Sequence, residues 1–166
     1  GVGQSETTVS KLVDIMLLLT ITGAGDQLQA IKRGIIELAH LIIVTKDDGD
    51  NQMKAKQTLI EFKNIISINT PVDEIWLPKV VKCSSINNNG IDEINIIVNQ
   101  FDNIARKEDS FITKRKKQEI FWIKKVLKDE LGNQKYSKLE GSNKLDDIIK
   151  NIISGKDDLL NIIQEH

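Results

Sequence analysis

Short apolar runs alternate with longer helical patterns through the first part of this chain, and this alternation limits the folds open to it. Apolar residues concentrate in three stretches, which read LVDIMLLLTI (12–21), LIIV (41–44) and LPKVVKCSS (77–85). Between and after them, apolar residues recur three and four positions apart in segments 25–39, 53–68 and 91–101. Strands that alternate with helices of this length are typical of βαβ units. We therefore predict an α/β fold, with a parallel sheet and flanking helices.

The chain changes character near Lys107, beyond which no further strand pattern occurs. Helical patterns cover residues 111–131, 143–154 and 156–166, and Gly132 follows the first of them as a candidate C-cap. We predict an α/β part at 1–107 and an all-helical extension at 108–166.

The first helical pattern of the extension carries an apolar stripe that is wide for a solvent-facing helix. The stripe comprises Ile112, Ile120, Ile123, Leu127 and Leu131, with Trp122 beside it. Either the two following helices or a second subunit must cover these residues. The sequence leaves both alternatives open.

Composition excludes several classes of partner and site. With 23 basic and 24 acidic side chains, the chain has no basic surplus for binding nucleic acid. Its longest apolar stretch, Ile15–Ile21, is too short to span a membrane. A single cysteine, Cys83, excludes an internal disulfide and suits a reducing compartment, so we expect a cytoplasmic protein. No His/Cys/carboxylate cluster has metal-site spacing, and we interpret His40, at a predicted helix–strand junction, as structural.

The stretch LIIVTKDDGD, residues 41–50, places four charged side chains directly after an apolar run. Four apolar residues bounded by polar ones are typical of a strand buried on both faces. In open α/β sheets the ligand crevice lies beyond the carboxyl ends of the strands, so these charges are placed to meet a ligand. A solvated turn is the alternative, and spacing alone does not separate the two.

The order Thr45-Lys46-Asp47-Asp48 has the form by which P-loop GTPases select guanine, [N/T]-K-x-D. A carboxylate at Asp48 can accept two hydrogen bonds at once from guanine, while the stem of Lys46 lies along the base. Ser84 and Ser85 follow the next predicted strand and are placed to offer backbone N–H groups to the guanine oxygen. Two such loops after successive strands favour a guanine site over a solvated turn.

The motifs GVGQSET, GAGDQLQAIKRGI, LIIVTKDDGD, W-L-P-K-V-x-x-C-S-S and GIDEI resemble, in order and spacing, the MeaB/ArgK family of GTPases. The resemblance implies a P-loop NTPase fold that binds GTP or GDP with Mg²⁺. It implies a chaperone for adenosylcobalamin-dependent methylmalonyl-CoA mutase, and a homodimer formed through the C-terminal helices. A transport-associated kinase role is the alternative within the family.

Residue roles follow from the resemblance, position by position. Gly1 would face the γ-phosphate and Gln4 would lie near the attacking water as the candidate catalytic residue, although Gln4 could equally be a polar loop residue. A switch that signals to the partner would include Asp26, Gln29 and Lys32, which otherwise form one face of a capped helix. Nucleotide-binding residues would be Gly1, Thr45, Lys46, Asp48, Ser84 and Ser85. Thr45 and Ser85 stand where the family usually has asparagine and alanine, which predicts weaker nucleotide binding.

The phosphate-binding loop G-x-x-x-x-G-K-[ST] does not occur in the 166 residues. That loop positions the phosphates and Mg²⁺, so we expect no GTP hydrolysis and no tight nucleotide binding by this chain alone. We expect it to be the C-terminal part of a longer GTPase, with roughly 100–150 further residues. A non-enzymatic helical interaction module is the alternative from another class.

Overall fold

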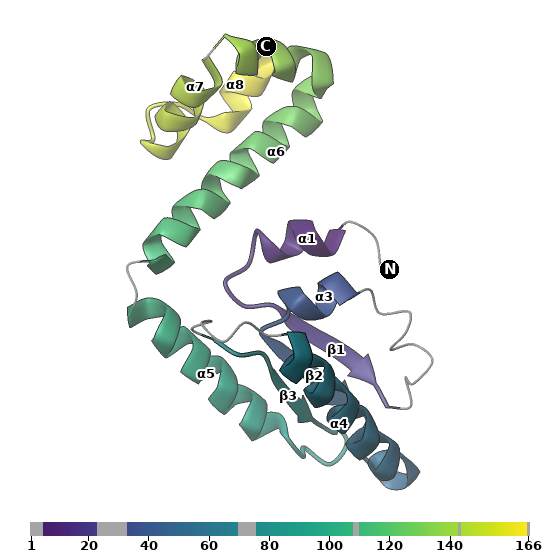
Figure 1. Ribbon diagram of the computed structural model, residues 1–166. Helices are drawn as coiled ribbons and strands as arrows, with labels where there is room; N and C mark the ends of the chain where they lie inside the picture. Colours follow the sequence, from purple (N-terminus) through teal and green to yellow (C-terminus); the bar gives the residue numbers. More distant parts are fainter. Residues whose placement is uncertain (1–4, 23–32, 70–75, 108–109, 143, 166) are drawn as a thin grey trace. The chain divides into compact units, whose positions relative to one another are not determined.

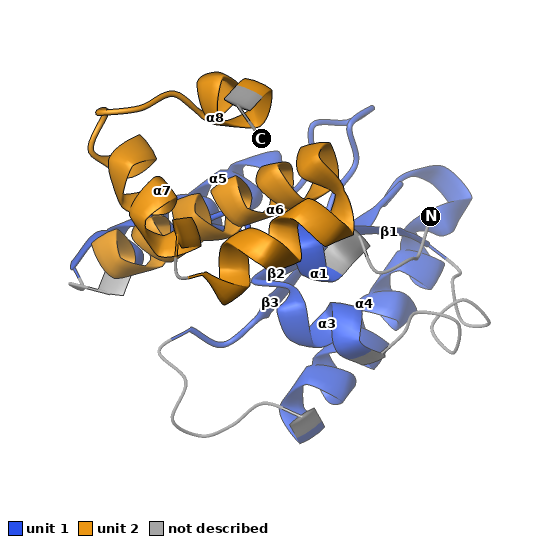
Figure 2. Ribbon diagram, turned by 90° about the horizontal axis from the view of Figure 1, so that it is seen from above, with its two compact units in different colours: residues 1–108 blue, residues 109–166 orange. Residues whose placement is uncertain are grey.

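The computed structural model describes residues 5–22, 33–69, 76–107, 110–142 and 144–165. The chain divides into two compact units, unit 1 (Gly1–Glu108) and unit 2 (Asp109–His166), coloured separately in Figure 2. All described strands belong to unit 1, and the regular structure described in unit 2 is helical. No helix among the described residues combines the length and apolar character needed to cross a membrane.

Unit 1 is built on a three-stranded parallel sheet in the order β1 (Leu17–Ile21), β2 (Leu41–Thr45) and β3 (Lys79–Lys82). Leu17 pairs with Leu41, and Leu41 pairs with Lys79. The central strand β2 is buried along its apolar run, as expected for a strand covered on both faces. The predicted α/β fold with a parallel sheet is confirmed.

The first strand is shorter than the apolar run 12–21 that predicted it. Pairing with β2 starts only at Leu17, because Met16 is bonded to His40 instead. The N–H of Met16 donates to His40 Nδ1 at 3.1 Å, and the Met16 carbonyl oxygen accepts the His40 N–H at 2.9 Å. The ring of His40 also packs edge-on against Phe101, with centroids 4.7 Å apart. These contacts give His40 the structural role predicted for it.

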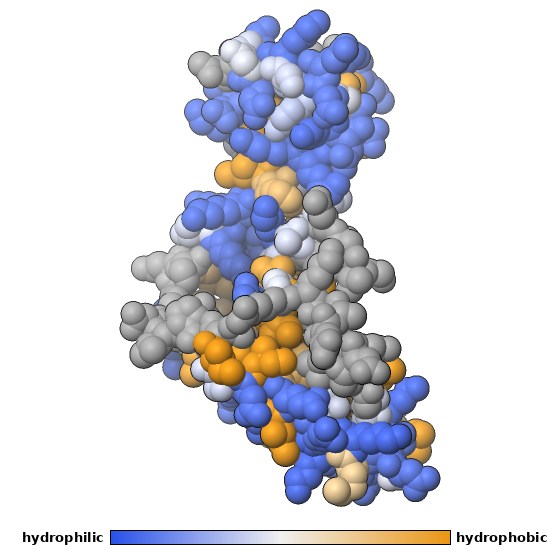
Figure 3. Space-filling view, turned by 45° about the vertical axis from the view of Figure 1, so that its right-hand side comes forward, coloured by the Kyte–Doolittle hydropathy of each residue, from blue (hydrophilic) through white to orange (hydrophobic). Residues whose placement is uncertain are grey.

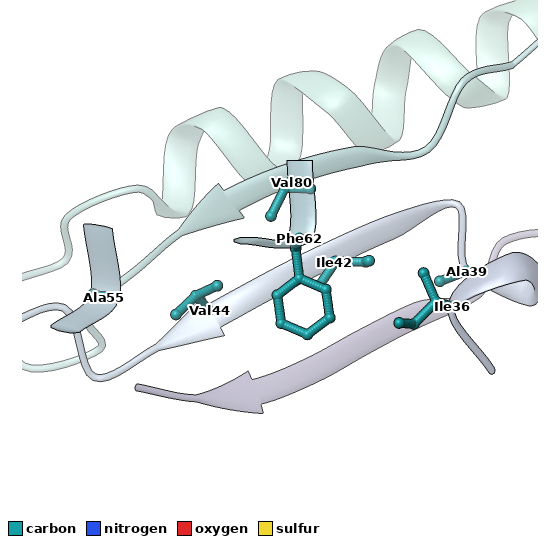
Figure 4. Close-up of a cluster of buried hydrophobic side chains, with 7 residues drawn as sticks. All are labelled: Ile36, Ala39, Ile42, Val44, Ala55, Phe62 and Val80. Carbon is teal, nitrogen blue, oxygen red and sulfur yellow. The ribbon is translucent and has the colours of Figure 1, made fainter. Parts of the chain in front are cut away.

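Helices cover both faces of the sheet, as Figure 1 shows. One face is covered by α3 (Arg33–Leu38) and α4 (Gln52–Asn69), which add Ile36, Ala55 and Phe62 to a buried cluster with β2 and β3. In Figure 4 the ring of Phe62 lies over the sheet near Ile42 and Val44. Full burial of such a side chain contributes about 1.5–3 kcal/mol relative to leaving it exposed.

The other face is covered by α5 (Ile91–Lys107), which contributes Ile97 to a second cluster with Leu41, Ile43 and Val81. Acidic residues occupy the first turn of α5 and basic residues its last turn, an arrangement that complements the helix dipole. This cluster does not reach β1, where Leu17, Leu19 and Ile21 are 38%, 64% and 45% exposed. Hydrophobic surface on unit 1 is visible as orange in Figure 3.

Two short elements of unit 1 were not predicted, α1 (Ser5–Ser10) and the 3₁₀ helix η1 (Gly49–Asn51). Both consist mainly of polar residues, so neither has the apolar spacing by which a helix is recognised. The predicted helix at 25–39 is represented by α3, and residues 23–32 lie outside the described residues.

Unit 2 contains α6 (Ser110–Gly141), α7 (Lys144–Ile153) and α8 (Leu159–Glu165). The regular path of α6 is interrupted at Gly132, whose φ of 74° and ψ of 164° are not helical. The predicted helix stop at Gly132 is therefore confirmed, and a second helical segment, which was not predicted, follows to Gly141.

The apolar stripe of α6 is partly covered from within the chain. Ile123 and Leu127 are buried in a cluster with residues of the second segment of α6, α7 and α8, namely Tyr136, Leu139, Leu145, Ile149 and Ile162. Of the two alternatives, intramolecular packing therefore holds for Ile123 and Leu127. By contrast, Ile112 and Trp122 are 64% and 49% exposed.

Candidate functional site

The carboxyl ends of the three strands carry the polar residues of the candidate site. Thr45, the last residue of β2, donates from Oγ1 to the carbonyl oxygen of Thr20 in β1 at 2.9 Å. The following residue, Lys46, is exposed and has a φ of 63°, which is uncommon outside glycine. The chain therefore leaves β2 through a sharp change of direction, anchored on the β1 side by Thr45.

The next residue, Asp47, is buried, with 1% of its surface exposed. Its N–H donates to the Cys83 carbonyl oxygen at 2.9 Å, which extends the contact between the ends of β2 and β3. Its Oδ2 lies 2.7 Å from Lys82 Nζ, an ion-pair distance. Among the described residues, neither carboxylate oxygen has a hydrogen bond of regular geometry, so the ion pair is the main compensation for burying this charge.

Asp48 and Ser84, one from each predicted base-reading loop, are in direct contact. Ser84 is fully buried and donates from Oγ to Asp48 Oδ2 at 2.5 Å. The Ser84 hydroxyl also accepts the N–H of Asn87 at 3.3 Å, and the Ser84 N–H donates to the Asn89 carbonyl oxygen at 2.9 Å. Asp48 itself is only half-buried. Ser84 thus fixes one carboxylate oxygen of a residue that is only partly covered.

The loop after β3 is closed tightly by Gly90, which has a φ of 77°. A Cβ at this position would collide with the carbonyl oxygen of Lys82, so only glycine allows the loop to return this close to the strand. Ser85 lies at the start of the loop and is exposed. The loop therefore holds Ser84 inward and presents Ser85 outward.

Burial between the two loops affects the thiol of Cys83. Its pKa is raised above the ordinary value of 9.0, first because burial disfavours the thiolate and second because the negative charge of Asp47 is near. A raised pKa keeps the thiol protonated near neutral pH, and the side chain packs in the cluster with Leu41, Ile43 and Val81. No group of three metal-ligating side chains is placed to hold an ion among the residues that the structure describes.

The structure places five of the predicted site residues at or just beyond the carboxyl ends of β2 and β3. They are Thr45, Lys46, Asp48, Ser84 and Ser85. The other five predicted residues lie outside the described residues, which are Gly1, Gln4, Asp26, Gln29 and Lys32. Sequence reasoning assigned no role to Asp47 or Lys82. The sequence signal that could have paired them is a carboxylate in the loop after one predicted strand and a lysine at the end of the next strand.

Comparison with known proteins identifies the family. The family model described as "Methylmalonyl Co-A mutase-associated GTPase MeaB" matches residues 1–140. The chain belongs to the MeaB family. Among curated MeaB relatives, the methylmalonic aciduria type A homolog of Caenorhabditis briggsae is 38% identical over 79% of the chain and 32% of that protein. GTPase ArgK of Escherichia coli K12 is 35% identical over 82% of the chain and 41% of that protein.

A solved structure also resembles this MeaB chain along its length. The crystal structure of an LAO/AO transport system kinase matches 99% of the chain and 54% of that protein, with 28% identity and a TM-score of 0.65. The predicted resemblance to the MeaB/ArgK family is confirmed by these matches. The matched segment spans about a third to two fifths of the curated relatives, 32% and 41% in the two cases above.

Proposed function

We propose that this chain is the guanine-reading part of a GTP-binding MeaB protein that acts with methylmalonyl-CoA mutase. The observation that carries the proposal is the contact between Asp48 and Ser84, which joins the two loops after neighbouring parallel strands. Membership of a family described as mutase-associated GTPases supports it.

The chemistry of Asp48 fits guanine. An ionised carboxylate only accepts hydrogen bonds, and it has several lone pairs for them. Guanine offers a ring N–H and an exocyclic amino group side by side, whereas adenine offers no such pair of donors. Since Ser84 approaches one oxygen of Asp48, the carboxylate is held in a fixed orientation before any base arrives. The exposed stem of Lys46 would lie along the base, with Thr45 and Ser85 at the rim.

The residues of the proposed base site do not supply the groups that bind the phosphates and Mg²⁺ in P-loop GTPases. The sequence contains no G-x-x-x-x-G-K-[ST], and the described residues contain no metal-ligating cluster. The residues in hand thus fit the base and not the phosphates or the ion. We assign GTP hydrolysis to the intact protein, where Gly1 and Gln4 would lie near the γ-phosphate and the attacking water, and Asp26, Gln29 and Lys32 would signal to the partner.

A titration followed by NMR tests the base-reading proposal. The full chain, labelled with ¹⁵N, is titrated with GDP, XDP and ADP at millimolar concentrations, because binding without a phosphate loop is weak. We expect GDP to shift the amide signals of Lys46, Asp48 and Ser85 and ADP to leave them in place. Asp48→Asn should change the preference from GDP to XDP, because an amide donates to the C2 oxygen of xanthine.

The matched control is Asp50→Asn, which removes a carboxylate two positions away on the exposed 3₁₀ helix η1. It should keep the preference for GDP. Equal shifts with GDP and ADP, or an Asp48→Asn variant that still prefers GDP, would rule out the base-reading proposal.

Assembly is the second part of the proposed function. Ile112 and Trp122 remain exposed on α6, whereas Ile123 and Leu127 are buried within unit 2 and Ile120 and Leu131 are partly buried there. Aromatic residues such as Trp122 are enriched at protein interfaces. We propose that Ile112 and Trp122 contribute to a homodimer formed through the C-terminal helices.

Light scattering tests the dimer with Ile112→Ser combined with Trp122→Ser, which avoids the buried residues of unit 2. The double variant should be monomeric at concentrations where the parent is dimeric. Met53→Ser, at a still more exposed position in unit 1, should not change the mass. A monomeric parent would remove the dimer from the proposal.

A non-enzymatic interaction module remains the second candidate, favoured by the missing phosphate loop together with the exposed residues of α6. The module predicts no nucleotide-dependent shifts and retained binding to purified methylmalonyl-CoA mutase. The similar solved structure is named a transport system kinase, so a transport-associated kinase that transfers a phosphate group is the other alternative. The same titration separates these candidates, because only the base-reading proposal requires a preference for GDP.

A further inference from the structure

Asp47 is the buried charge that the proposed base-reading chemistry does not use. It lies between the exposed Lys46 and the half-buried Asp48, yet only 1% of its surface is accessible. A carboxylate removed from water is unfavourable unless a partner compensates for it. Lys82 is that partner, at 2.7 Å, and its side chain keeps 38% exposure, so its ammonium group remains partly hydrated.

The backbone next to Asp47 is in an unfavoured conformation. Lys46 has a φ of 63°, and a residue with a side chain keeps such a conformation only when its surroundings hold it there. Asp47 provides two contacts immediately after that residue, its N–H to the Cys83 carbonyl oxygen and its carboxylate to Lys82. Both contacts are made to the end of β3.

Two consecutive carboxylates are therefore bound to two residues on either side of Cys83. Asp47 is bound by Lys82 and Asp48 by Ser84. Because the two carboxylates are adjacent in the chain, the placement of the first restricts the placement of the second. The contact from Lys82 thereby acts on the orientation of Asp48 without touching a ligand.

We propose that Asp47 and Lys82 form a positioning pair, which holds the loop after β2 so that Asp48 faces the base. This inference rests on the proposed base-reading function and deepens it. It adds two residues that affect guanine selectivity by orienting Asp48, without contacting the base.

A pair that served only the stability of the fold would behave differently in one variant. A buried ion pair can often be replaced by apolar residues without loss of stability, whereas removal of one partner leaves an uncompensated charge. The combination of Asp47→Ala with Lys82→Met removes both charges. A purely structural pair predicts that this double variant keeps the GDP affinity and the amide exchange of the parent, whatever its stability. A positioning pair predicts a stable protein whose loop is loosened and whose base selectivity is reduced.

The first measurement is GDP and ADP titration of the full chain by NMR. In the double variant we expect GDP affinity to fall about tenfold, while ADP binding is unchanged. This is roughly the effect of weakening one charge-assisted hydrogen bond between Asp48 and the base. The single variant Lys82→Arg, made in the parent, should keep most of the parent's GDP affinity, because it keeps an ion pair with Asp47. The matched control is Lys79→Met, which removes a lysine from the opposite end of the same strand and should leave GDP affinity unchanged.

The second measurement needs no ligand. Amide hydrogen exchange is compared at Asp47, whose N–H is bonded to Cys83, and at Cys83, whose N–H is bonded to Val44 at 2.8 Å. After correction for the different intrinsic exchange rates of aspartate and alanine amides, we expect the double variant to exchange faster than the parent at position 47, while Cys83 exchanges as in the parent.

The two measurements distinguish the failure of each proposal. If the parent chain does not prefer GDP to ADP, the base-reading function fails, and faster exchange confined to Asp47 would still support the positioning of the loop. If the parent prefers GDP and the double variant keeps both its affinity and its exchange pattern, the positioning pair is wrong. Faster exchange with unchanged GDP affinity would also overturn it.

Discussion

The two units bury different kinds of side chain. Four polar residues are buried among the described residues, and all four belong to unit 1: Thr20, Asp47, Thr58 and Ser84. The buried cluster of unit 2 is apolar except for the hydroxyl of Tyr136. Three of the four polar residues lie at or just beyond the carboxyl end of a strand. Buried polar residues thus concentrate at the carboxyl ends of the strands, where α/β sheets bind ligands.

The chain provides a separate optical probe for each side of this comparison. Its two tryptophans are Trp76 in unit 1 and Trp122 in unit 2. Single-tryptophan variants, made with Trp122→Phe or Trp76→Phe, report the unfolding of one unit at a time.

The largest expected effect follows from Phe62, which is fully buried against the sheet. Phe62→Ala should lower the free energy of unfolding of unit 1 by about 3–5 kcal/mol, because it removes apolar burial and leaves a cavity. Urea unfolding monitored by Trp76 measures it. Met53→Ala on the same helix, where the side chain is 78% exposed, is the control and should change little.

A similar loss is expected in unit 2 from Leu127→Ala, about 2–5 kcal/mol, since Leu127 is fully buried in the apolar cluster. Trp122 fluorescence should show the shift and Trp76 should not. If both probes shift together in either variant, the units unfold as one, and separate free energies of unfolding cannot be assigned to them.

Two glycines should respond to alanine with opposite signs. Gly132 has φ 74° and ψ 164°, a region essentially restricted to glycine, so Gly132→Ala should destabilise unit 2 by about 1–3 kcal/mol. Gly34 lies within α3 with open space around it, and Gly34→Ala should stabilise unit 1 by about 0.5–1 kcal/mol. Thermal unfolding of both variants checks the signs. A stabilised Gly132→Ala would show that α6 continues through this position in solution.

The smallest expected effect is a loss of unfolding free energy at alkaline pH, and it is expected in both units. Burial raises the pKa of Cys83 above 9.0 in unit 1 and that of Tyr136 above 10.0 in unit 2, with Asp47 and Glu140 as the secondary causes. Below these values both folded and unfolded groups are protonated, so stability does not depend on them. Above them the unfolded group loses its proton first, and stability falls as pH rises through the folded pKa.

Urea unfolding between pH 8 and pH 11 should therefore show unit 1 weakening at lower pH than unit 2. Cys83→Ala should remove the dependence from unit 1 and Tyr136→Phe from unit 2. An unchanged pH dependence in either variant would mean that other groups, such as lysines, dominate the alkaline loss.

The elements that sequence reasoning predicted well are those with local signals. The β2 run is apolar because both of its faces are covered, and α5 repeats its apolar residues at helical spacing. Gly132 marked a helix stop because few other residues adopt its conformation. The helical segment after Gly132 was missed because its sequence, NQKYSKLEG, contains only two buried positions, Tyr136 and Leu139.

The candidate site was predictable as a set of loops and not as a set of contacts. Thr45, Lys46, Asp48, Ser84 and Ser85 were expected after strands on motif grounds. The bond between Ser84 and Asp48 joins residues 36 positions apart, and it depends on the parallel register of β2 and β3. The ion pair of Asp47 with Lys82 follows from the same register. Nothing in the spacing of charges along a single sequence distinguishes it from two solvated side chains.

The two outer strands of the sheet differ in a way that affects how the chain can be handled. At one edge, β3 carries Lys79 and Lys82 and is preceded by Pro78, which discourage pairing with another chain. At the other, β1 reads LLLTI, without a charge or a proline, and exposes three of its apolar side chains. In a concentrated solution such a strand is a template for intermolecular β-structure. We therefore expect Leu19→Lys, at the most exposed of these positions, to reduce association of the chain through β1.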